Sequence, residues 1–199
     1  MEHGKFLEEL GELCVKEETY PSFLDWDELR TVMETDMPAG RLERVKDVFV
    51  FCALTGLSYQ GISTLCPSHL FRDDEGTLWI CRTRAEGAEV GDSCTSRVPL
   101  LKPAMVLLEK YRGWNLMNPE GPCFPVPSVQ KMNEYLKEVS VLCRISKRLT
   151  TQMARNTFAA TVTLANRIPK EHVGEMLGYS SDYMLRHYMQ ALERNSQKA

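Results

Sequence analysis

The sequence predicts a mainly α-helical domain that carries one small antiparallel β-sheet, an α+β fold. Apolar residues recur at helical spacing in both halves of the chain, and only residues 69–100 change to short apolar runs separated by turns. The chain has 199 residues and is 43% hydrophobic, which is enough for one domain with a substantial core. We therefore expect one domain over residues 23–199, preceded by an acidic helical extension over residues 1–22.

The first half of the chain is expected to be helical. Residues 5–18 place their apolar side chains on one face and are otherwise acidic, and Pro21 interrupts that pattern. Asp25 is placed to cap the next helix, in which we expect Trp26 to belong to the core. The expected helices of this half span residues 5–18, 25–33, 41–54 and 58–65.

A small sheet is expected in the middle of the chain. Residues 73–76 supply a turn, and a Gly-containing loop covers residues 85–94. Trp79 lies in the second of three apolar runs and is expected in the core. The expected strands span residues 69–71, 78–81 and 96–100.

Helices return after the sheet. Pro103 is placed to open a helix, whereas residues 113–128 are rich in Gly and Pro and are expected to form a loop. The expected helices of this half span residues 103–111, 128–143, 150–165, 169–177 and 181–193.

The charge is unevenly distributed along the chain. The net charge is −3, but residues 1–36 carry 3 Lys/Arg against 11 Asp/Glu, while residues 131–199 carry 11 against 6. A locally basic face can bind phosphate while an acidic segment lies elsewhere, because charges beyond about 10 Å are largely screened at 0.1 M salt. An ordinary solvated surface is the alternative interpretation of charge alone.

The cysteines and the apolar runs indicate the compartment. Seven cysteines form an odd set without a Cys-x-x-Cys pair, which favours buried free thiols in a reducing cytoplasm over a zinc site. No run approaches the roughly 18–20 apolar residues of a membrane helix, and the acidic N-terminus is unlike a signal peptide. We expect a cytoplasmic protein without a metal or another cofactor.

Two segments carry a family resemblance. Residues 150–190 hold Arg155 in a polar-x-x-Arg step, then Leu177-Gly178, and then Tyr188 nine residues beyond the residue that follows Gly178. Residues 49–59 read FVFCALTGLSY. Together these segments resemble the catalytic domain of the tyrosine recombinases, the phage-type integrases, in the branch common in Bacteroides-type bacteria.

This resemblance implies a fold, a reaction and a partner. It implies the tyrosine recombinase catalytic-domain fold and site-specific recombination of double-stranded DNA, with possible assembly of a homo-oligomer on that DNA. Tyr188 would attack a phosphodiester and form a 3′-phosphotyrosine, and Arg155 would hold the phosphate oxygens. Because the covalent link conserves the energy of the broken bond, the resemblance implies that neither ATP nor a metal is needed.

Several catalytic positions depart from the family pattern. Gln152 stands where the family has His, and an amide cannot accept a proton near neutral pH. Tyr179 stands in place of His or Trp, and Ser58 in place of the first Arg. Glu86 falls at or near the position of the family's β-hairpin Lys, where Arg84 is the nearby basic residue that could substitute.

Lys147 and Arg148 precede an expected helix start at Thr150, and we expect them to contact backbone phosphate.

Three function hypotheses remain at this point. The first hypothesis is a bacterial, nucleoid-associated recombinase of mobile-element type, either a fragment of a longer integrase or a truncated relative. The second is a non-catalytic DNA-binding descendant of that fold. The third is a protein interaction module that uses the acidic N-terminal segment.

Overall fold

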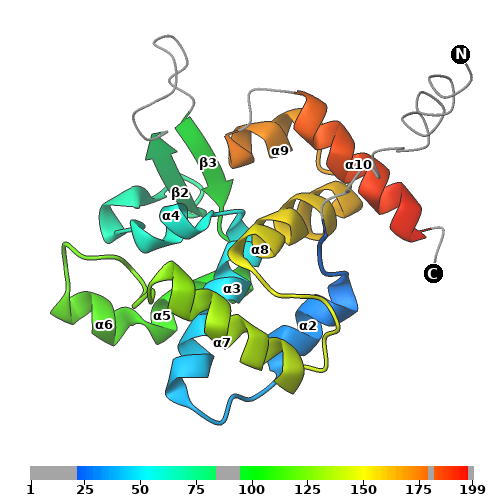
Figure 1. Cartoon of the computed structure of the whole chain (residues 1–199). Coiled ribbons are helices and arrows are strands. Elements are labelled where there is room, and N and C mark those ends of the chain that lie inside the picture. Colours follow the sequence, from blue (N-terminus) through cyan, green and yellow to red (C-terminus); the bar gives the residue numbers. More distant parts are fainter. Residues whose placement is uncertain (1–21, 84–94, 179–181, 197–199) are drawn as a thin grey trace, which may run out of the picture.

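The computed structural model describes residues 22–83, 95–178 and 182–196, and it confirms the predicted α+β class (Figure 1). The α-helices are α2 (Trp26–Glu34), α3 (Gly40–Thr55), α4 (Tyr59–Ser63), α5 (Lys102–Lys110), α6 (Arg112–Met117), α7 (Val129–Leu142), α8 (Thr151–Thr157), α9 (Lys170–Leu177) and α10 (Asp182–Ser196). The shorter helical segments are η1 (Pro67–His69), η2 (Phe158–Thr163) and η3 (Leu164–Asn166), and the strands are β1 (Leu70–Arg72), β2 (Leu78–Thr83) and β3 (Thr95–Pro99).

Helix α3 is the centre of the domain. Its residues are buried without interruption from Val45 to Thr55, and it packs against α2, α5, α7 and α8 (Figure 1). A helix that is apolar on all sides is stable only when other helices surround it, which explains this central position. Helix α3 ends at Gly56, whose φ of 72° lies in the left-handed region that glycine adopts without a steric penalty.

Polar groups buried on α3 have partners. Asp47 is 3% exposed. Its Oδ2 accepts a hydrogen bond from the Tyr111 hydroxyl at 2.9 Å and forms an ion pair with Lys110 Nζ at 2.6 Å. Burial and the neighbouring Asp47 raise the pKa of Tyr111, so its hydroxyl stays a donor. Lys46 donates to the Thr35 carbonyl at 2.9 Å. These contacts tie α5 and the end of α2 to the central helix.

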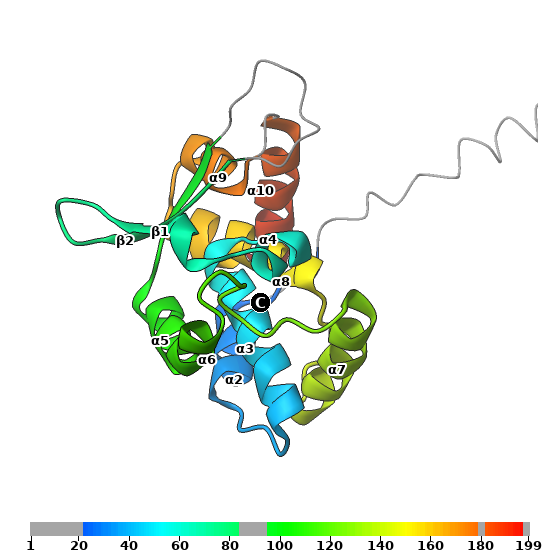
Figure 2. The ribbon, with the colours of Figure 1, turned by 90° about the vertical axis from the view of Figure 1, so that its left-hand side faces the viewer.

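The three strands form the one antiparallel sheet that the sequence predicts, and their order in it is β1-β2-β3. Ile80 pairs with Val98, and both are 1% exposed, so this face of the sheet packs on the helical body. The turn between β1 and β2 projects away from the helices (Figure 2). The sheet therefore lies at one side of the domain, with β3 against α9.

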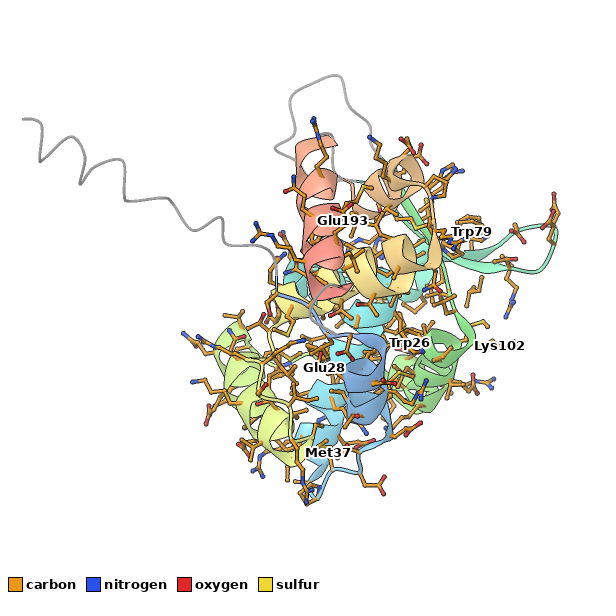
Figure 3. The ribbon with its side chains drawn as sticks, turned by 90° about the vertical axis from the view of Figure 1, so that its right-hand side faces the viewer. Trp26, Glu28, Met37, Trp79, Lys102 and Glu193 are labelled. Atoms are coloured by element: carbon orange, nitrogen blue, oxygen red, sulfur yellow. The ribbon has the colours of Figure 1, made fainter. Side chains whose placement is uncertain are left out.

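The expectation that two tryptophans belong to the core is wrong. Trp26 is 47% exposed on the outer side of α2, because the apolar face of that helix is formed by Leu29 and Val32 (Figure 3). Trp79 is only partly buried, and its ring stacks on Phe71 with the centroids 6.4 Å apart. Its position on β2 is opposite in face to the buried Ile80, which explains the partial exposure.

The loop expected over residues 113–128 begins later than predicted. Helix α6 occupies its first part, and the Trp114 indole donates to the Pro122 carbonyl at 3.0 Å. This bond holds the returning chain against α6. The Gly and Pro content of the segment therefore marks only its second part, after Met117.

The helix expected over residues 150–165 has three different hydrogen-bonding patterns. Helix α8 continues into a π-helical segment, η2, and then into the 3-10 turn η3. Within η2 the Thr163 hydroxyl donates to the carbonyls of Phe158 and Ala159, at 3.1 and 2.7 Å. Such back-bonding competes with regular helical pairing. Widened π turns are frequent at functional sites.

Residues 22–24 are tied to this segment. The Leu24 amide donates to the Thr157 hydroxyl at 3.0 Å, and the Thr161 hydroxyl donates to the Leu24 carbonyl. Phe23 is 4% exposed and packs with Ala160 of η2. The described chain therefore begins beside η2, where α10 also packs. The acidic helix expected over 5–18 and the loop over 85–94 lie outside the described residues.

Candidate functional site

Arg155 joins three segments at the centre of the candidate site. It extends from α8 and is partly buried, and its guanidinium donates to the Gly56 carbonyl at the end of α3 and to the Leu177 carbonyl at the end of α9. The helix begins at Thr150, whose hydroxyl accepts from the Met153 amide at 3.0 Å. This cap fixes the first turn and so the direction of Arg155.

Cys52 is fully buried in the core near Arg155. Burial raises the pKa of the Cys52 thiol to about 12, although the nearby positive charge of Arg155 acts in the opposite direction. The thiol is therefore neutral at physiological pH, and we assign it a packing role rather than that of a nucleophile.

Tyr188 lies on α10 with its ring in the core. It is 1% exposed, and its hydroxyl donates to Asn156 Oδ1 at 2.9 Å. Gln152 Nε2 donates to the same oxygen at 3.0 Å, and the Asn156 amide nitrogen donates to the Ser22 carbonyl at 2.9 Å. One buried side chain thus connects α10, α8 and the start of the described chain.

The sequence interpretation did not include Asn156. It lies four residues after Gln152, so one turn of α8 places both side chains on the same side. That spacing was the available signal, but nothing in the sequence indicated that Tyr188 would approach this face. The structure brings Gln152 and Tyr188 together through Asn156, while the carbonyls that bind Arg155 belong to Gly56 and Leu177.

Ser58 caps helix α4. Its Oγ accepts a hydrogen bond from the Gly61 amide at 3.1 Å, and the side chain is exposed. It lies two residues after Gly56, which accepts from Arg155. The structure therefore places Ser58 on the same short segment as one of the carbonyls that bind Arg155.

Three residues of the sequence hypothesis lie outside the described residues. They are Arg84 and Glu86, which follow β2, and Tyr179, which follows Gly178. Their expected roles therefore stay predictions.

The two basic residues before α8 differ in their surroundings. Lys147 Nζ forms an ion pair with Glu28 at 2.6 Å and donates to the Phe23 carbonyl at 3.0 Å. Its charge is thus offset by a carboxylate of α2, which makes it an anchor for that helix. Arg148 is exposed, and its expected contact with a phosphate stays a prediction.

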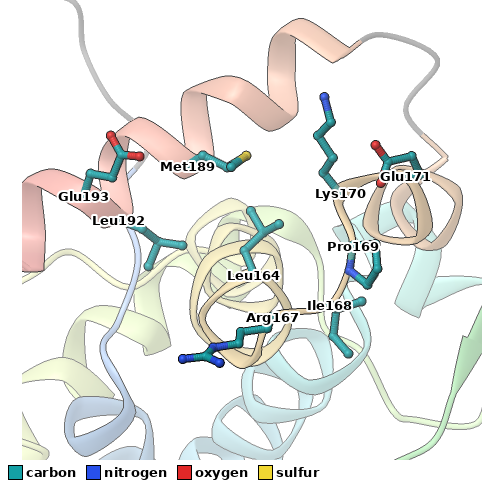
Figure 4. A pocket seen from close by; sticks show the side chains of 9 residues that line it. All are labelled: Leu164, Arg167, Ile168, Pro169, Lys170, Glu171, Met189, Leu192 and Glu193. Atoms are coloured by element: carbon teal, nitrogen blue, oxygen red, sulfur yellow. The ribbon is translucent and has the colours of Figure 1, made fainter.

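A hollow of about 480 Å³ lies between the turn that precedes α9 and one side of α10 (Figure 4). Its apolar lining comes from Leu164, Ile168, Pro169, Met189 and Leu192, and its charged lining from Arg167, Lys170, Glu171 and Glu193. None of the residues that the sequence assigned to the site lines it. Helix α10 therefore turns Tyr188 into the core and Met189 towards this hollow.

Within residues 22–83, 95–178 and 182–196, no three His, Cys, Asp or Glu side chains gather as a metal site would require. In the same ranges no helix has both the length and the apolar character needed to cross a membrane.

The fold is similar to that of solved tyrosine recombinases. A XerH site-specific recombinase bound to a palindromic difH substrate, in a post-cleavage complex, matches with a TM-score of 0.72 at 14% identity, over 90% of this chain and 52% of that chain. The XerA recombinase matches with a TM-score of 0.63 at 18% identity, over 87% of this chain and 61% of that chain. A lambda integrase dimer bound to a COC′ core site matches at 0.59 and 15% identity, over 86% and 60%.

These matches confirm the predicted tyrosine recombinase catalytic-domain fold. This chain spans only 52% to 61% of the length of those three structures. No protein-family model and no curated protein sequence matches it. At identities of 14% to 18% the likeness shows the fold, and the chemistry must be argued from the residues.

Proposed function

We propose that this chain is a catalytic domain of a tyrosine recombinase, of the Bacteroides-type integrase branch, that binds double-stranded DNA and recombines it at specific sites. The observation that carries this proposal is the meeting of Tyr188 with α8. Its hydroxyl bonds to Asn156, the residue next to Arg155 in the chain. A nucleophile and a phosphate-binding arginine thus converge on one helix, within the fold whose solved members include recombinases bound to DNA substrates.

In the proposed reaction the Tyr188 oxygen attacks the phosphorus of a DNA phosphodiester. A bond forms between that oxygen and phosphorus, and the bond from phosphorus to the 5′ oxygen breaks. The phenol proton leaves to solvent, because neither Gln152 nor Asn156 can accept it, and the departing 5′ oxygen takes up a proton from solvent. The 5′ hydroxyl of another strand later attacks the 3′-phosphotyrosine and restores the tyrosine. Neither ATP nor a metal takes part in this scheme.

Arg155 has the properties that a phosphate-binding group requires. Its planar guanidinium stays charged at any physiological pH and can hold two phosphate oxygens at once. The Gly56 and Leu177 carbonyls already fix its position, so little reorganisation is needed in the transition state. Gln152 is exposed three residues before Arg155 on α8 and can donate an amide hydrogen to a phosphate oxygen.

Cleavage requires Tyr188 to leave its buried position. With 1% of its surface exposed, the hydroxyl cannot reach a phosphate outside the domain. We propose that DNA binding moves the middle of α10 and frees the side chain. In the same scheme Arg148 and Lys147 contact the DNA backbone, Lys147 after exchanging Glu28 for phosphate, and a second copy binds the neighbouring half of the site.

The test is a covalent-adduct assay. The protein and its Tyr188→Phe variant are incubated with nicked duplexes drawn from the flanks of its own gene, and the products are separated under denaturing conditions. The expected result is a protein–DNA adduct with the original protein and none with Tyr188→Phe. An adduct that persists in the phenylalanine variant would assign the nucleophile to another residue.

A non-catalytic DNA-binding protein of the same fold is the second candidate. It is favoured by Gln152, which replaces the proton-accepting His of the family, and by the enclosed hydroxyl of Tyr188. Loss of a single transition-state donor typically lowers a rate by about 10²–10³. Duplex binding without an adduct, also in a longer N-terminally extended chain, would establish this second function.

A further inference from the structure

We propose that Cys66 is a peroxide-reactive thiol, for which His69 is the proton acceptor and Cys123 the resolving thiol, so that oxidation ends in a Cys66–Cys123 disulfide. The three residues lie where η1 meets the segment that follows α6. None of them belongs to the motifs that suggest a recombinase, so this modification site is independent of the proposed function. In a reducing compartment such a disulfide is transient rather than structural.

Cys66 is in contact with a histidine. Its Sγ lies 3.1 Å from His69 Nδ1, and its backbone amide donates to the same nitrogen at 3.1 Å. An amide N–H can only donate, so Nδ1 carries a lone pair and the ring hydrogen is on Nε2. The thiol is therefore the donor in the contact between sulfur and nitrogen. The turn η1, which begins after Cys66 and ends at His69, holds the two side chains together.

The surroundings of His69 make it a proton acceptor. Burial, and then the positive charge of Arg82, lower the pKa of His69, so the ring is neutral at physiological pH and can take the thiol proton. Arg82 donates to the Gly61 carbonyl and to the Thr64 hydroxyl, the latter at 2.8 Å and two residues before Cys66. A cation is thus fixed near the sulfur, and such a charge stabilises a thiolate.

Cys123 comes close to Cys66 from a distant part of the chain. The Cys123 amide donates to the Leu65 carbonyl at 2.6 Å. Standard backbone dimensions then keep the Cα atoms of Cys66 and Cys123 within about 7 Å of each other. Disulfides usually join Cα atoms about 4.4–6.8 Å apart, so the backbone already has the required proximity. Both thiols are free in this structure.

The two cysteines differ in the way that an attacking and a resolving thiol differ. Cys66 is partly exposed, so a molecule as small as hydrogen peroxide reaches it, whereas Cys123 is 0% exposed. Burial, and then the negative charge of a nearby Cys66 thiolate, raise the pKa of Cys123 to about 11. Cys123 therefore stays a thiol at physiological pH. Cys66 reacts with peroxide first, and Cys123 reacts with the product.

The proposed chemistry has two steps, and each is balanced. In the first, the Cys66 sulfur attacks one oxygen of hydrogen peroxide, the S–O bond forms and the O–O bond breaks. The thiol proton passes through His69 to the departing hydroxide, which leaves as water, so the sulfur is oxidised and the peroxide reduced. In the second, the Cys123 sulfur attacks the Cys66 sulfenic acid. The S–S bond forms, the S–O bond breaks, and the Cys123 proton leaves with the hydroxide as water.

The experiment compares Cys66 with Cys81 inside the same molecule. Cys81 of β2 is also partly exposed, but among the five described cysteines only Cys66 has a histidine nitrogen within hydrogen-bond distance. The reduced protein is treated with hydrogen peroxide and dimedone, which traps sulfenic acids, and peptide mass spectrometry gives the rate at each cysteine. A second series without dimedone maps the disulfides in unreduced peptides. No DNA is present, so failure of the proposed function would not affect the result.

We expect Cys66 to react about 10²-fold faster than Cys81, because only Cys66 has a base in contact. His69→Asn keeps an acceptor for the Cys66 amide but cannot take up a proton, so it should remove most of this difference. Cys123→Ala should leave the first step unchanged. It should increase the dimedone adduct on Cys66 and abolish the disulfide. The thermal unfolding temperature of each variant shows whether it is folded.

Three results would overturn the proposal. Equal rates at Cys66 and Cys81 in the original protein would show that Cys66 is an ordinary thiol, and this comparison requires no variant to fold. A Cys66 disulfide that forms with a cysteine other than Cys123 would remove the resolving role. An unchanged Cys66 rate in folded His69→Asn would remove the role of His69. If that variant does not fold, His69→Gln replaces it, because it also offers an amide oxygen without a base.

Discussion

At the scale of single residues, Asn156 determines where Tyr188 lies. Its side-chain oxygen accepts from the Tyr188 hydroxyl and from Gln152, and its nitrogen donates to the Ser22 carbonyl. Only 7% of the surface of Asn156 is exposed, so burying its amide without these partners would lower the stability of the fold. The Tyr188 hydroxyl is buried and needs an acceptor, and the Asn156 oxygen supplies it.

The variant Asn156→Leu should destabilise the protein by about 1–3 kcal/mol, because the Tyr188 hydroxyl and the Ser22 carbonyl then lose a buried partner. Urea denaturation measures the change in the free energy of unfolding. The control Gln152→Ala alters an exposed side chain of the same helix and should cost less than about 0.5 kcal/mol. In the double variant with Tyr188→Phe, the two losses should not add, because they share one hydrogen bond. Full additivity would contradict the shared bond.

At the scale of elements, the end of α3 controls the site through Gly56. A Cβ atom there would lie 2.6 Å from the Phe158 ring of η2 and 2.9 Å from the Leu177 side chain of α9. The same residue offers its carbonyl to Arg155. Gly56 therefore has a left-handed backbone, packs closely against Phe158 and Leu177, and offers its carbonyl to Arg155. Only glycine, which has no Cβ atom, can meet the first two requirements together.

The variant Gly56→Ala should destabilise the protein by about 2–5 kcal/mol, the sum of a left-handed backbone penalty and of overpacking. Gly178→Ala is the matched control, because its φ is also positive, at 65°, but its Cβ would meet open space. That control isolates the backbone penalty of about 1–2 kcal/mol. Urea denaturation of both variants measures the difference. Equal losses would show that the contacts with Phe158 and Leu177 carry no strain.

At the scale of the whole molecule, a net charge of −3 is compatible with DNA binding because the charges are segregated. Residues 131–199 have an excess of five positive charges, since they carry 11 Lys/Arg against 6 Asp/Glu, whereas residues 1–36 are strongly acidic. Some basic residues, such as Lys147, are already paired with carboxylates. The number of phosphate contacts should therefore be smaller than the count of basic residues.

Duplex affinity should fall steeply with salt, because phosphate contacts release counterions. The variant Arg148→Gln should lower the slope of log affinity against log salt by about 1. Arg30→Gln is the control, because Arg30 lies on α2 and faces Asp27 at 3.7 Å. Fluorescence anisotropy over a range of salt concentrations measures both slopes. An affinity that is independent of salt would instead favour the protein interaction module.

The candidate site was predictable in part. Arg155 and Tyr188 carry residue types and spacings that the sequence displays directly, and the structure places both on or against α8. Asn156 was not predictable in this way. It acts through a contact between residues 32 positions apart. Such a contact depends on how α10 docks against α8, and local spacing does not contain that information.

The sequence by itself determined the α+β class, the three short strands, the long apolar helix α3 and the two segments that resemble a recombinase. Hydrophobic periodicity and turn residues are local properties, so these features follow from neighbours in the chain. Only the tertiary structure decided that Trp26 faces solvent, that Lys147 is paired with Glu28 and that Tyr188 is enclosed beside Asn156. Each of these depends on which element covers a given face, and that is settled by packing across the whole domain.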